Sequence, residues 1–412
     1  TTGNANTAIG ENALPYNTTG SNNAALGNNA AQTNTTGSNN TAIGSKALSV
    51  NSTGSDNVAI GREAALNNTN DAITAIGSQA LMTNTTGLFN TAIGYQSLFS
   101  NTTGNLNTAI GYQSLFSNTT GNYNTAVGWS TLFSNTTGSG NTAMGEAALT
   151  YNTTGSNNAA LGNNAAQSNT TGSSNTAIGS QALVANTTGA LNTAIGYQSL
   201  FSNTSGSENV AIGKDAGQSN TTGSQNTAIG VSALSENSTG SVNTAIGWYA
   251  MQRNTVGAAN TALGEYALSN NTTGLTNVAI GANALAANTT GSDNIALGKS
   301  ANVGSGNLSN AIAIGTDAIV NTSNSMVLGN GVNVGIGTSS PAYDLHIKSS
   351  SAELFKKPFY VEQADNDFPL FLLSDNPSNN GFVLYDKFGN ASAVFNTGND
   401  SYFNTSGFFG IG

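Results

Sequence analysis

The sequence predicts an all-β solenoid, in which one short coil of chain stacks on copies of itself. The main observation is a glycine that returns every 17 residues, as at Gly27, Gly44 and Gly61. One step of 16 leads to Gly77, and the period of 17 then continues to Gly315. A fixed short period of this kind is typical of stacked repeat units. Only 7% of residues are charged, yet the apolar residues stay strictly periodic, which favours order over disorder.

Each repeat has a recognisable content when positions are counted from that glycine as 0. Ala or Ser stands at +3, Leu at +4, Asn at +7, Thr-Thr-Gly at +8 to +10, and Asn-Thr-Ala-Ile at +13 to +16. The last segment reads as a short strand, in which +14 and +16 share one face. Position +14 is also Val58 or Val210, and +16 stays aliphatic or Met. We therefore expect +14 and +16 to point into the coil and the Ala at +15 to approach another subunit.

The segment Asn-Thr-Thr-Gly, as at 101–104, predicts a turn in which Gly supplies a positive φ. Stacked copies would place the Asn side chains above one another in amide ladders. Seventeen residues suit two short strands and two turns. About 19 such coils would make a rod on the order of 90 Å long. Because each coil buries little apolar surface, we expect a parallel homotrimer, with a monomeric solenoid as the simpler alternative.

Aromatic residues recur at repeat spacing as well. Tyr95 and Tyr112 share +1, and Phe99 and Phe116 share +5. Such a stripe could bind sugar or protein, although a stripe that covers a subunit seam is the favoured interpretation. The Asn-x-Thr/Ser triplets are formal glycosylation acceptors. Their register at +7 favours a role in the turn.

Three segments are predicted along the chain. A shaft of 17-residue repeats covers 1–301, transition coils and a connector cover 302–348, and a small β domain covers 349–412. A step of 14 separates Gly315 from Gly329, where the pattern loosens. The small domain is predicted to be antiparallel from the alternating runs Phe359–Val361, Leu370–Leu373, Phe382–Tyr385 and Ala393–Phe395. A hairpin turn is predicted at Asp386–Asn390, and Phe409–Gly412 reads as a second Gly-Ile-Gly segment.

No motif for catalysis is found, and we expect no enzyme activity, no cofactor and no metal site. His346 is the only histidine, so a His-based triad or metal cluster cannot form within one chain. Asp56, Glu208 and Asp293 share position +12 and are expected to be solvated turn charges, whereas glycoside hydrolysis needs paired carboxylates.

Charge and hydropathy exclude further classes. A net charge of −10 without a basic run argues against nucleic-acid binding, and no apolar run reaches the length of a membrane span. The chain has no cysteine, so no disulfide or thiolate chemistry is expected. It begins within a repeat and without Met, and we expect a fragment or a processed product.

Segments such as Asn57–Gly61 and Asn209–Gly213 resemble the head repeats of trimeric autotransporter adhesins, whose signature is a Ser/Thr-Val-Ala-Ile-Gly-like pentapeptide. That resemblance implies left-handed, parallel, trimeric coils. The family's usual repeat is shorter and matches only the step of 14 from Gly315 to Gly329. The segment Val334–Ile347 is similar to the Gly-Ile-Gly-Thr-x-Ser-Pro-x-x-x-Leu-His-Ile connector of phage tail fibres. Both resemblances imply an extracellular fibre.

The expected function is therefore a non-enzymatic, extracellular, trimeric fibre of the bacterial surface adhesin or phage tail-fibre type. Its expected partners are two further copies of itself and a receptor, such as a glycan, on a host cell or environmental surface. The alternatives are an ice-binding or other lattice-binding solenoid and, more remotely, a polysaccharide-degrading tail spike. The expectation that Thr at +14 points inward argues against ice binding.

Overall fold

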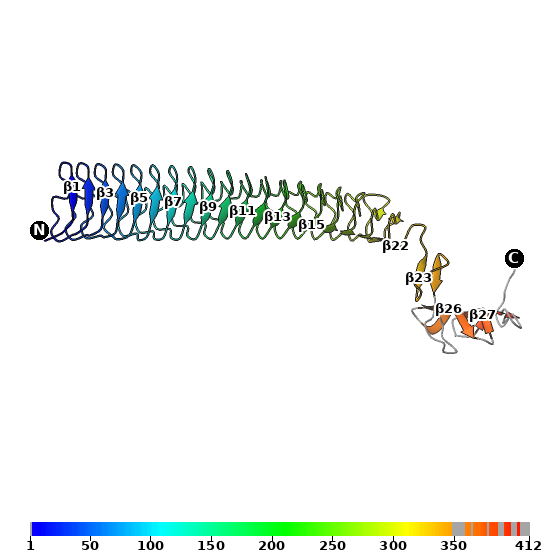
Figure 1. The fold of residues 1–412 in the computed structure, drawn as a ribbon. Coiled ribbons are helices and arrows are strands. Elements are labelled where there is room, and N and C mark those ends of the chain that lie inside the picture. The colour runs from blue at the N-terminus through cyan, green and yellow to red at the C-terminus, as the bar shows by residue number, and fades with distance from the viewer. Residues whose placement is uncertain are drawn as a thin grey trace. The chain divides into compact units, whose positions relative to one another are not determined.

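The computed structural model describes residues 2–347 and five strands between residues 359 and 403. The chain divides into two units, Thr1–Val327 and Leu328–Gly412. The first unit is a β-solenoid whose 20 strands form one parallel sheet along a rod (Figure 1). The described residues contain no helix. The predicted all-β solenoid is confirmed, and the predicted segment boundaries stay predictions.

The sheet takes one short strand from each coil. Its strands are β1 (Thr7–Ile9), β2 (Ala24–Leu26), β3 (Thr41–Ile43), β4 (Val58–Ile60), β5 (Thr74–Ile76), β6 (Thr91–Ile93), β7 (Thr108–Ile110), β8 (Thr125–Val127), β9 (Thr142–Met144), β10 (Ala159–Leu161), β11 (Thr176–Ile178), β12 (Thr193–Ile195), β13 (Val210–Ile212), β14 (Thr227–Ile229), β15 (Thr244–Ile246), β16 (Thr261–Leu263), β17 (Val278–Ile280), β18 (Ile295–Leu297), β20 (Ala311–Ile314) and β22 (Ser325–Leu328). Neighbouring strands pair in register, so that Ala177 lies beside Ala194. Identical side chains therefore form columns along the rod.

The prediction of two strands in every coil is wrong. Positions +2 and +4 adopt positive φ, as in Gln181 (φ 59) and Leu183 (φ 55), and these left-handed residues bend the chain where a second strand would run. A second strand forms only near the end of the solenoid, where β19 (Asn302–Val303) pairs with β21 (Ile319–Val320).

The strands face the opposite way from the prediction. Ala177 and Ala211, at +15, are 0% exposed, whereas Ile178 and Ile212, at +16, are 39% and 37% exposed. The expectation that +14 and +16 point inward is thus wrong. The coil interior already holds the +4 side chain, such as Leu183, and two columns of buried Asn, so that only a methyl group fits between them. The bulkier β-branched residues suit the outer, pleated surface.

Buried asparagines form the predicted amide ladders. At +7, the Asn169 Nδ2 atom donates to Asn152 Oδ1 in the preceding coil (2.7 Å) and to Gly172 O in its own turn (2.9 Å). At +13, the Asn158 Nδ2 atom donates to Gly172 O (2.9 Å), and its Oδ1 atom accepts the backbone N–H of Asn175 (2.9 Å). Buried polar groups are costly without hydrogen-bond partners. The ladders supply these partners, so that even a thin coil can hold asparagine side chains in its interior.

The glycine at +10 is required for a different reason from the predicted one. Gly172 does not adopt a positive φ; the glycine with that conformation is at position 0, as in Gly179 (φ 128). A Cβ atom on Gly172 would instead lie 2.4 Å from both Asn169 Oδ1 and Gly189 O. The turn is thus so tight that only hydrogen fits between the amide ladder and the next coil.

We expect Gly172→Ala to lower the free energy of unfolding by about 3 kcal/mol, because the added methyl group must displace backbone and ladder atoms. Thermal unfolding followed by circular dichroism measures the effect. Thr171→Ala is the matched control: Thr171 is the exposed neighbour at +9, and we expect a change within about 0.5 kcal/mol. Equal stability of the two variants would contradict the tight turn.

The 16-residue step before Gly77 is a local defect in the solenoid. Thr74 still pairs with Val58 and Thr91, so the sheet register is kept. The missing residue comes from the turn, where the carbonyl oxygen of Asn70 accepts from Asn57 Nδ2 (2.9 Å). Ile73 takes the place of the +13 Asn and is fully buried, which interrupts one amide column at a single coil.

The second unit contains two small sheets. Strands β23 (Val334–Ile336) and β24 (Leu345–Ile347) form a parallel pair. The other sheet has five antiparallel strands: β25 (Phe359–Gln363), β26 (Asn366–Asn376), β27 (Asn379–Tyr385), β28 (Ala391–Asn396) and β29 (Tyr402–Phe403). The four predicted runs lie within β25 to β28, which confirms the antiparallel sheet. The predicted turn at Asp386–Asn390 and the segment Phe409–Gly412 lie outside the described residues.

Candidate interaction surface

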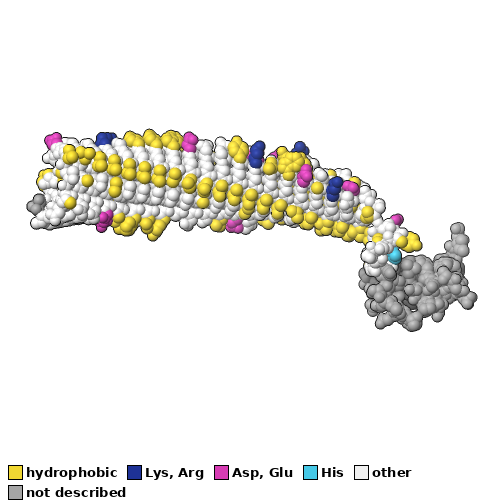
Figure 2. All heavy atoms as spheres, viewed as in Figure 1, with side chains coloured by type: hydrophobic (Ala, Val, Ile, Leu, Met, Phe, Trp, Pro, Cys, Tyr) yellow, Lys and Arg dark blue, Asp and Glu magenta, His cyan; other side chains and the backbone are white. Residues whose placement is uncertain are grey.

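The outer side of the solenoid sheet is an apolar face, which we define as the +14 and +16 side chains of β1 to β18 and β20. Position +14 contributes Thr, Val, Ala or Ile, and +16 contributes Ile, Leu, Val or Met. No member of the apolar face is charged. Hydrophobic side chains run in rows along the rod (Figure 2). The in-register pairing of the strands makes each column straight and continuous.

This apolar face is large for a surface that meets only water. With a coil spacing of roughly 4.8 Å and a width of about 10 Å, it covers on the order of 1,000 Å². Because Thr occupies most of the +14 column, the purely apolar part is roughly half of that area, at the upper end of the range of about 300–600 Å² for the largest apolar patch of a typical monomer. Ile9, Leu26, Met144 and Leu263 are among its most exposed members. This face is therefore the candidate interaction surface of the solenoid.

Aromatic residues form stacked ladders on another part of the coil. Tyr95 stacks on Tyr112 with ring centroids 5.5 Å apart and planes 18° apart, and Tyr112 stacks on Trp129 at 6.3 Å and 12°. Phe99 and Phe116 stack at 5.1 Å. Neighbouring rings cover each other's faces and turn their edges to solvent. The predicted stripe therefore exists, and its proposed contact with a subunit seam stays a prediction.

A second aromatic cluster has a different geometry. Tyr249 and Tyr266, at +2, stack at 5.4 Å with planes 5° apart. Trp248, at +1, is nearly perpendicular to both: its ring centroid lies 4.7 Å from that of Tyr249 and 5.0 Å from that of Tyr266, with interplanar angles of 71° and 67°. Here one ring lies across two others instead of extending their stack.

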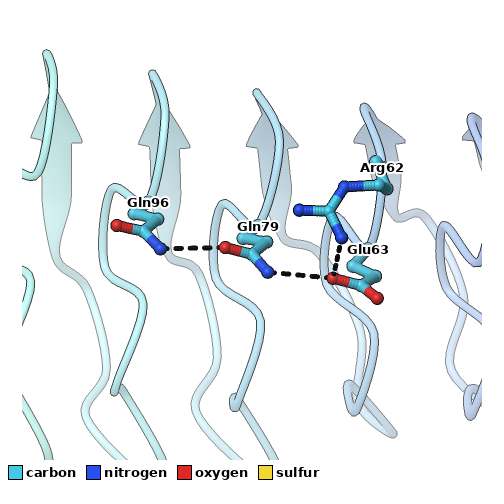
Figure 3. Close-up of polar contacts among 4 residues, drawn as sticks. All are labelled: Arg62, Glu63, Gln79 and Gln96. Atoms are coloured by element: carbon cyan, nitrogen blue, oxygen red, sulfur yellow. Dashed lines mark hydrogen bonds and ion pairs between the residues drawn. The ribbon is translucent and has the colours of Figure 1, made fainter.

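Half-buried polar side chains also interact along the rod. Gln96 donates to Gln79 (2.8 Å), and Gln79 donates to Glu63 (2.9 Å), which also binds the neighbouring Arg62 (2.8 Å; Figure 3). These residues share positions +1 and +2 on successive coils. Their hydrogen-bonding groups are used between coils, so this row reads as a structural ladder.

The acidic residues considered above lie apart from one another. Asp56 accepts from Asn39 (2.9 Å), Glu208 accepts from Gln225 (3.1 Å), and Asp293 accepts from Thr276. All three carboxylates are exposed. This placement agrees with the expectation of solvated charges at the turns. No two of these three carboxylates form a pair suited to glycoside hydrolysis.

His346 lies in β24, where its Nδ1 atom accepts the backbone N–H of Ala342 (3.2 Å) and its ring contacts that of Tyr343 edge to face. These contacts give His346 a structural role in the β23–β24 segment. Among the described residues, no group of three His, Cys, Asp or Glu side chains could hold a metal ion. The absence of enzyme activity and of cofactors stays a prediction.

The Asn-x-Thr/Ser triplets at +7 place their amides inside the coil. Asn118, for example, is 0% exposed and donates to Asn101 Oδ1 (2.8 Å) and Gly121 O (3.0 Å). A buried amide nitrogen in a continuous ladder is not accessible to a glycosyltransferase once the coil has formed. The structure thus supports the role of these triplets in the turn.

Comparison with models of known protein families and with curated proteins gives no match. In the part of the chain that the structure describes, no helix is long and apolar enough to cross a membrane. The fold and the surface together define a β-solenoid repeat protein with one extended, uncharged face.

Proposed function

We propose that this chain is the shaft of an extracellular fibre in which three parallel copies pack through their apolar faces, and that the fibre mediates adhesion. The observation that carries the proposal is the continuous, uncharged apolar face, which is half-exposed in a single chain. The proposed contact between subunits differs from the one expected from the sequence. It is made by the isoleucine column at +16 instead of the Ala at +15, which is buried within the coil.

A second copy of this chain is the partner that fits this face best. The side chains of the apolar face repeat at the coil spacing over the whole solenoid, so a matching surface must repeat at the same spacing. Another copy in parallel register meets that requirement by symmetry. The estimated area of on the order of 1,000 Å² per chain is also in the range of stable interfaces.

The narrow face favours three copies over two. Each strand is three residues wide and has only two outward columns, +14 and +16. In a three-fold arrangement, the +14 column can contact one neighbouring copy and the +16 column the other. A two-copy sandwich packs one whole sheet face against another and suits sheets with more than two outward columns. The resemblance to trimeric autotransporter adhesins supports the same arrangement and implies left-handed coils.

Sedimentation and light scattering of the purified chain test the assembly. We expect a mass three times the 41.3 kDa of one chain, and electron microscopy is expected to show a straight rod without large lateral bundles. A monomer at micromolar concentration, with its apolar face open to solvent, would contradict the proposal.

Adhesion, an extracellular location and a tail-fibre or cell-surface origin rest on the resemblances of the repeats and of Val334–Ile347. A fibre holds its binding elements away from the surface that carries it, and weak contacts repeated on three chains add as avidity. Binding of the labelled fibre to candidate host cells, measured against an unrelated rod of similar length, tests this part separately.

The ice-binding alternative is favoured by one observation. Thr at +14 faces outward on a regular sheet, contrary to the expectation that had argued against this function. Thr is replaced in this column by Ala24, Val58, Ala159, Val210, Val278, Ile295 and Ile312, and the adjacent +16 column is aliphatic or Met. Thermal hysteresis of the purified protein tests it: hysteresis in a monomer would favour ice binding, and its absence in a trimer would exclude this use of the apolar face.

A further inference from the structure

The orientation of Trp248 can be worked out from its two tyrosine neighbours. Its ring centroid is nearly equidistant from those of Tyr249 and Tyr266, and its plane is close to perpendicular to both. An indole edge cannot point at a face of both tyrosines, because these rings stack on each other. An edge-to-edge contact would place the centroids farther apart. One face of the indole therefore rests on the edges of both tyrosines.

Among the described residues, no further aromatic ring contacts Trp248, and its side chain is 45% exposed, so the opposite face of the indole is the one open to a ligand. This distinguishes Trp248 from Trp129, the other tryptophan of the chain, which also occupies +1 and is also exposed. The ring of Trp129 continues the stack of Tyr112 and turns an edge outward. Of the two tryptophans, Trp248 is thus the one whose ring lies across its aromatic neighbours and offers a flat face on the side of the rod.

We infer that Trp248 is a stacking site for a pyranose ring of a receptor glycan. A sugar ring has one apolar C–H face, which suits a single flat indole, and hydroxyl groups at its rim. Val231, exposed at +1 in the preceding coil, extends the apolar platform, and Glu265, exposed at +1 in the following coil, supplies a carboxylate that accepts hydrogen bonds from hydroxyls.

A cationic ligand fits this site less well. Quaternary ammonium groups are usually enclosed by several aromatic faces in a cage, whereas the two tyrosines here present only their edges to Trp248 and one indole face is free. A single stacking platform holds a sugar weakly, and three copies in a trimeric fibre would raise the overall affinity through avidity. In this respect the inference rests on the proposed function.

Tryptophan fluorescence tests the inference on the full chain, since Trp129→Phe leaves Trp248 as the only tryptophan. We expect the emission of this variant to change saturably on titration with at least one of lactose, cellobiose and maltose, at millimolar concentrations. The Trp248→Phe variant, which retains Trp129, should give no saturable change with the same sugars.

A binding measurement completes the test. On surfaces coated with the responding disaccharide, Trp248→Ala should reduce retention of the fibre at least tenfold, whereas Trp129→Ala should change it less than twofold. Circular dichroism confirms that the solenoid is intact in each variant. No saturable response with any of the three sugars, or an equal response from Trp129, would overturn the inference. A fibre that trimerises and binds cells without a Trp248 response would refute the sugar site alone.

Discussion

Asn158→Asp exchanges a single amide group for a carboxylate, and we expect it to reduce the stability of the solenoid more than any other substitution that exchanges one functional group. Asn158 is 2% exposed at position +13. Its Nδ2 atom donates to Asn141 Oδ1 (3.1 Å) and to Gly172 O (2.9 Å). In the Asp variant, an ionised carboxylate oxygen takes the place of Nδ2. It lies beside two hydrogen-bond acceptors and carries no proton to donate to either of them. We expect the free energy of unfolding to fall by about 4 kcal/mol at pH 7, as measured by thermal unfolding.

The effect should depend on pH in a defined direction. Burial among acceptors raises the pKa of the introduced carboxyl above its unfolded value, because the neutral form can donate the missing hydrogen bond. The penalty is therefore largest above the raised, folded-state pKa. It declines as the pH falls through the interval between that value and the unfolded pKa of about 3.9, and it is smallest below both.

Asn157→Asp is the matched control, since Asn157 is the adjacent residue of the same type and is exposed at +12. Position +12 is naturally acidic at Asp56 and Asp293, with the same positive φ. We expect little change in stability at any pH. A similar loss in both variants would show that the amide ladder is not what makes Asn158 sensitive.

Much of the solenoid could be predicted from the period alone. The glycine spacing gives the coil length, and recurrent Asn at +7 and +13 predicts the ladders, because identical residues in register must lie above one another. Even the step of 16 before Gly77 could be placed in the turn. These predictions need only the repeat, since stacking converts a sequence period directly into spatial neighbours.

The direction of the strand faces could not be derived in the same way. Alternation shows which residues share a face and leaves open which face is inside. Aliphatic residues at +16 suggest an interior, but the coil is so thin that Leu at +4 and the buried asparagines already fill it, which leaves room only for a methyl group. The constancy of Ala at +15 was the informative signal, because a packed interior tolerates less variation in volume than a surface does.

The orientation of the Trp248 ring could not be predicted from the sequence either. Trp129 and Trp248 share position +1, and nothing in the repeat register separates them. What differs is the residue beside each one. Tyr249 and Tyr266 add a stacked pair at +2, whereas Trp129 has Ser130 at that position. The pair provides the edges on which an indole can lie flat, so the distinction depends on side-chain packing between two coils.

Replacing Ile178, Ile195 and Ile212 together with Glu is expected to dissociate the proposed trimer and leave the coil folded. These side chains form three consecutive steps of the +16 column and point outward. In the assembled fibre each would lose about 2 kcal/mol of apolar burial, and each would place a charge beside its symmetry copies. We expect the mass in solution to fall to that of one chain at micromolar concentration, with an unchanged circular dichroism spectrum.

The triple variant Leu191→Glu, Val231→Glu and Val242→Glu is the control. Its side chains are at least as exposed in a single chain, at 57%, 41% and 54%, but they occupy +12 and +1, outside the apolar face. This variant should stay trimeric, because only a contact specific to the apolar face makes charge there disruptive. Unfolding of the Ile178, Ile195 and Ile212 variant would show instead that the column is buried within the coil, and dissociation of both variants would place the contact elsewhere on the rod.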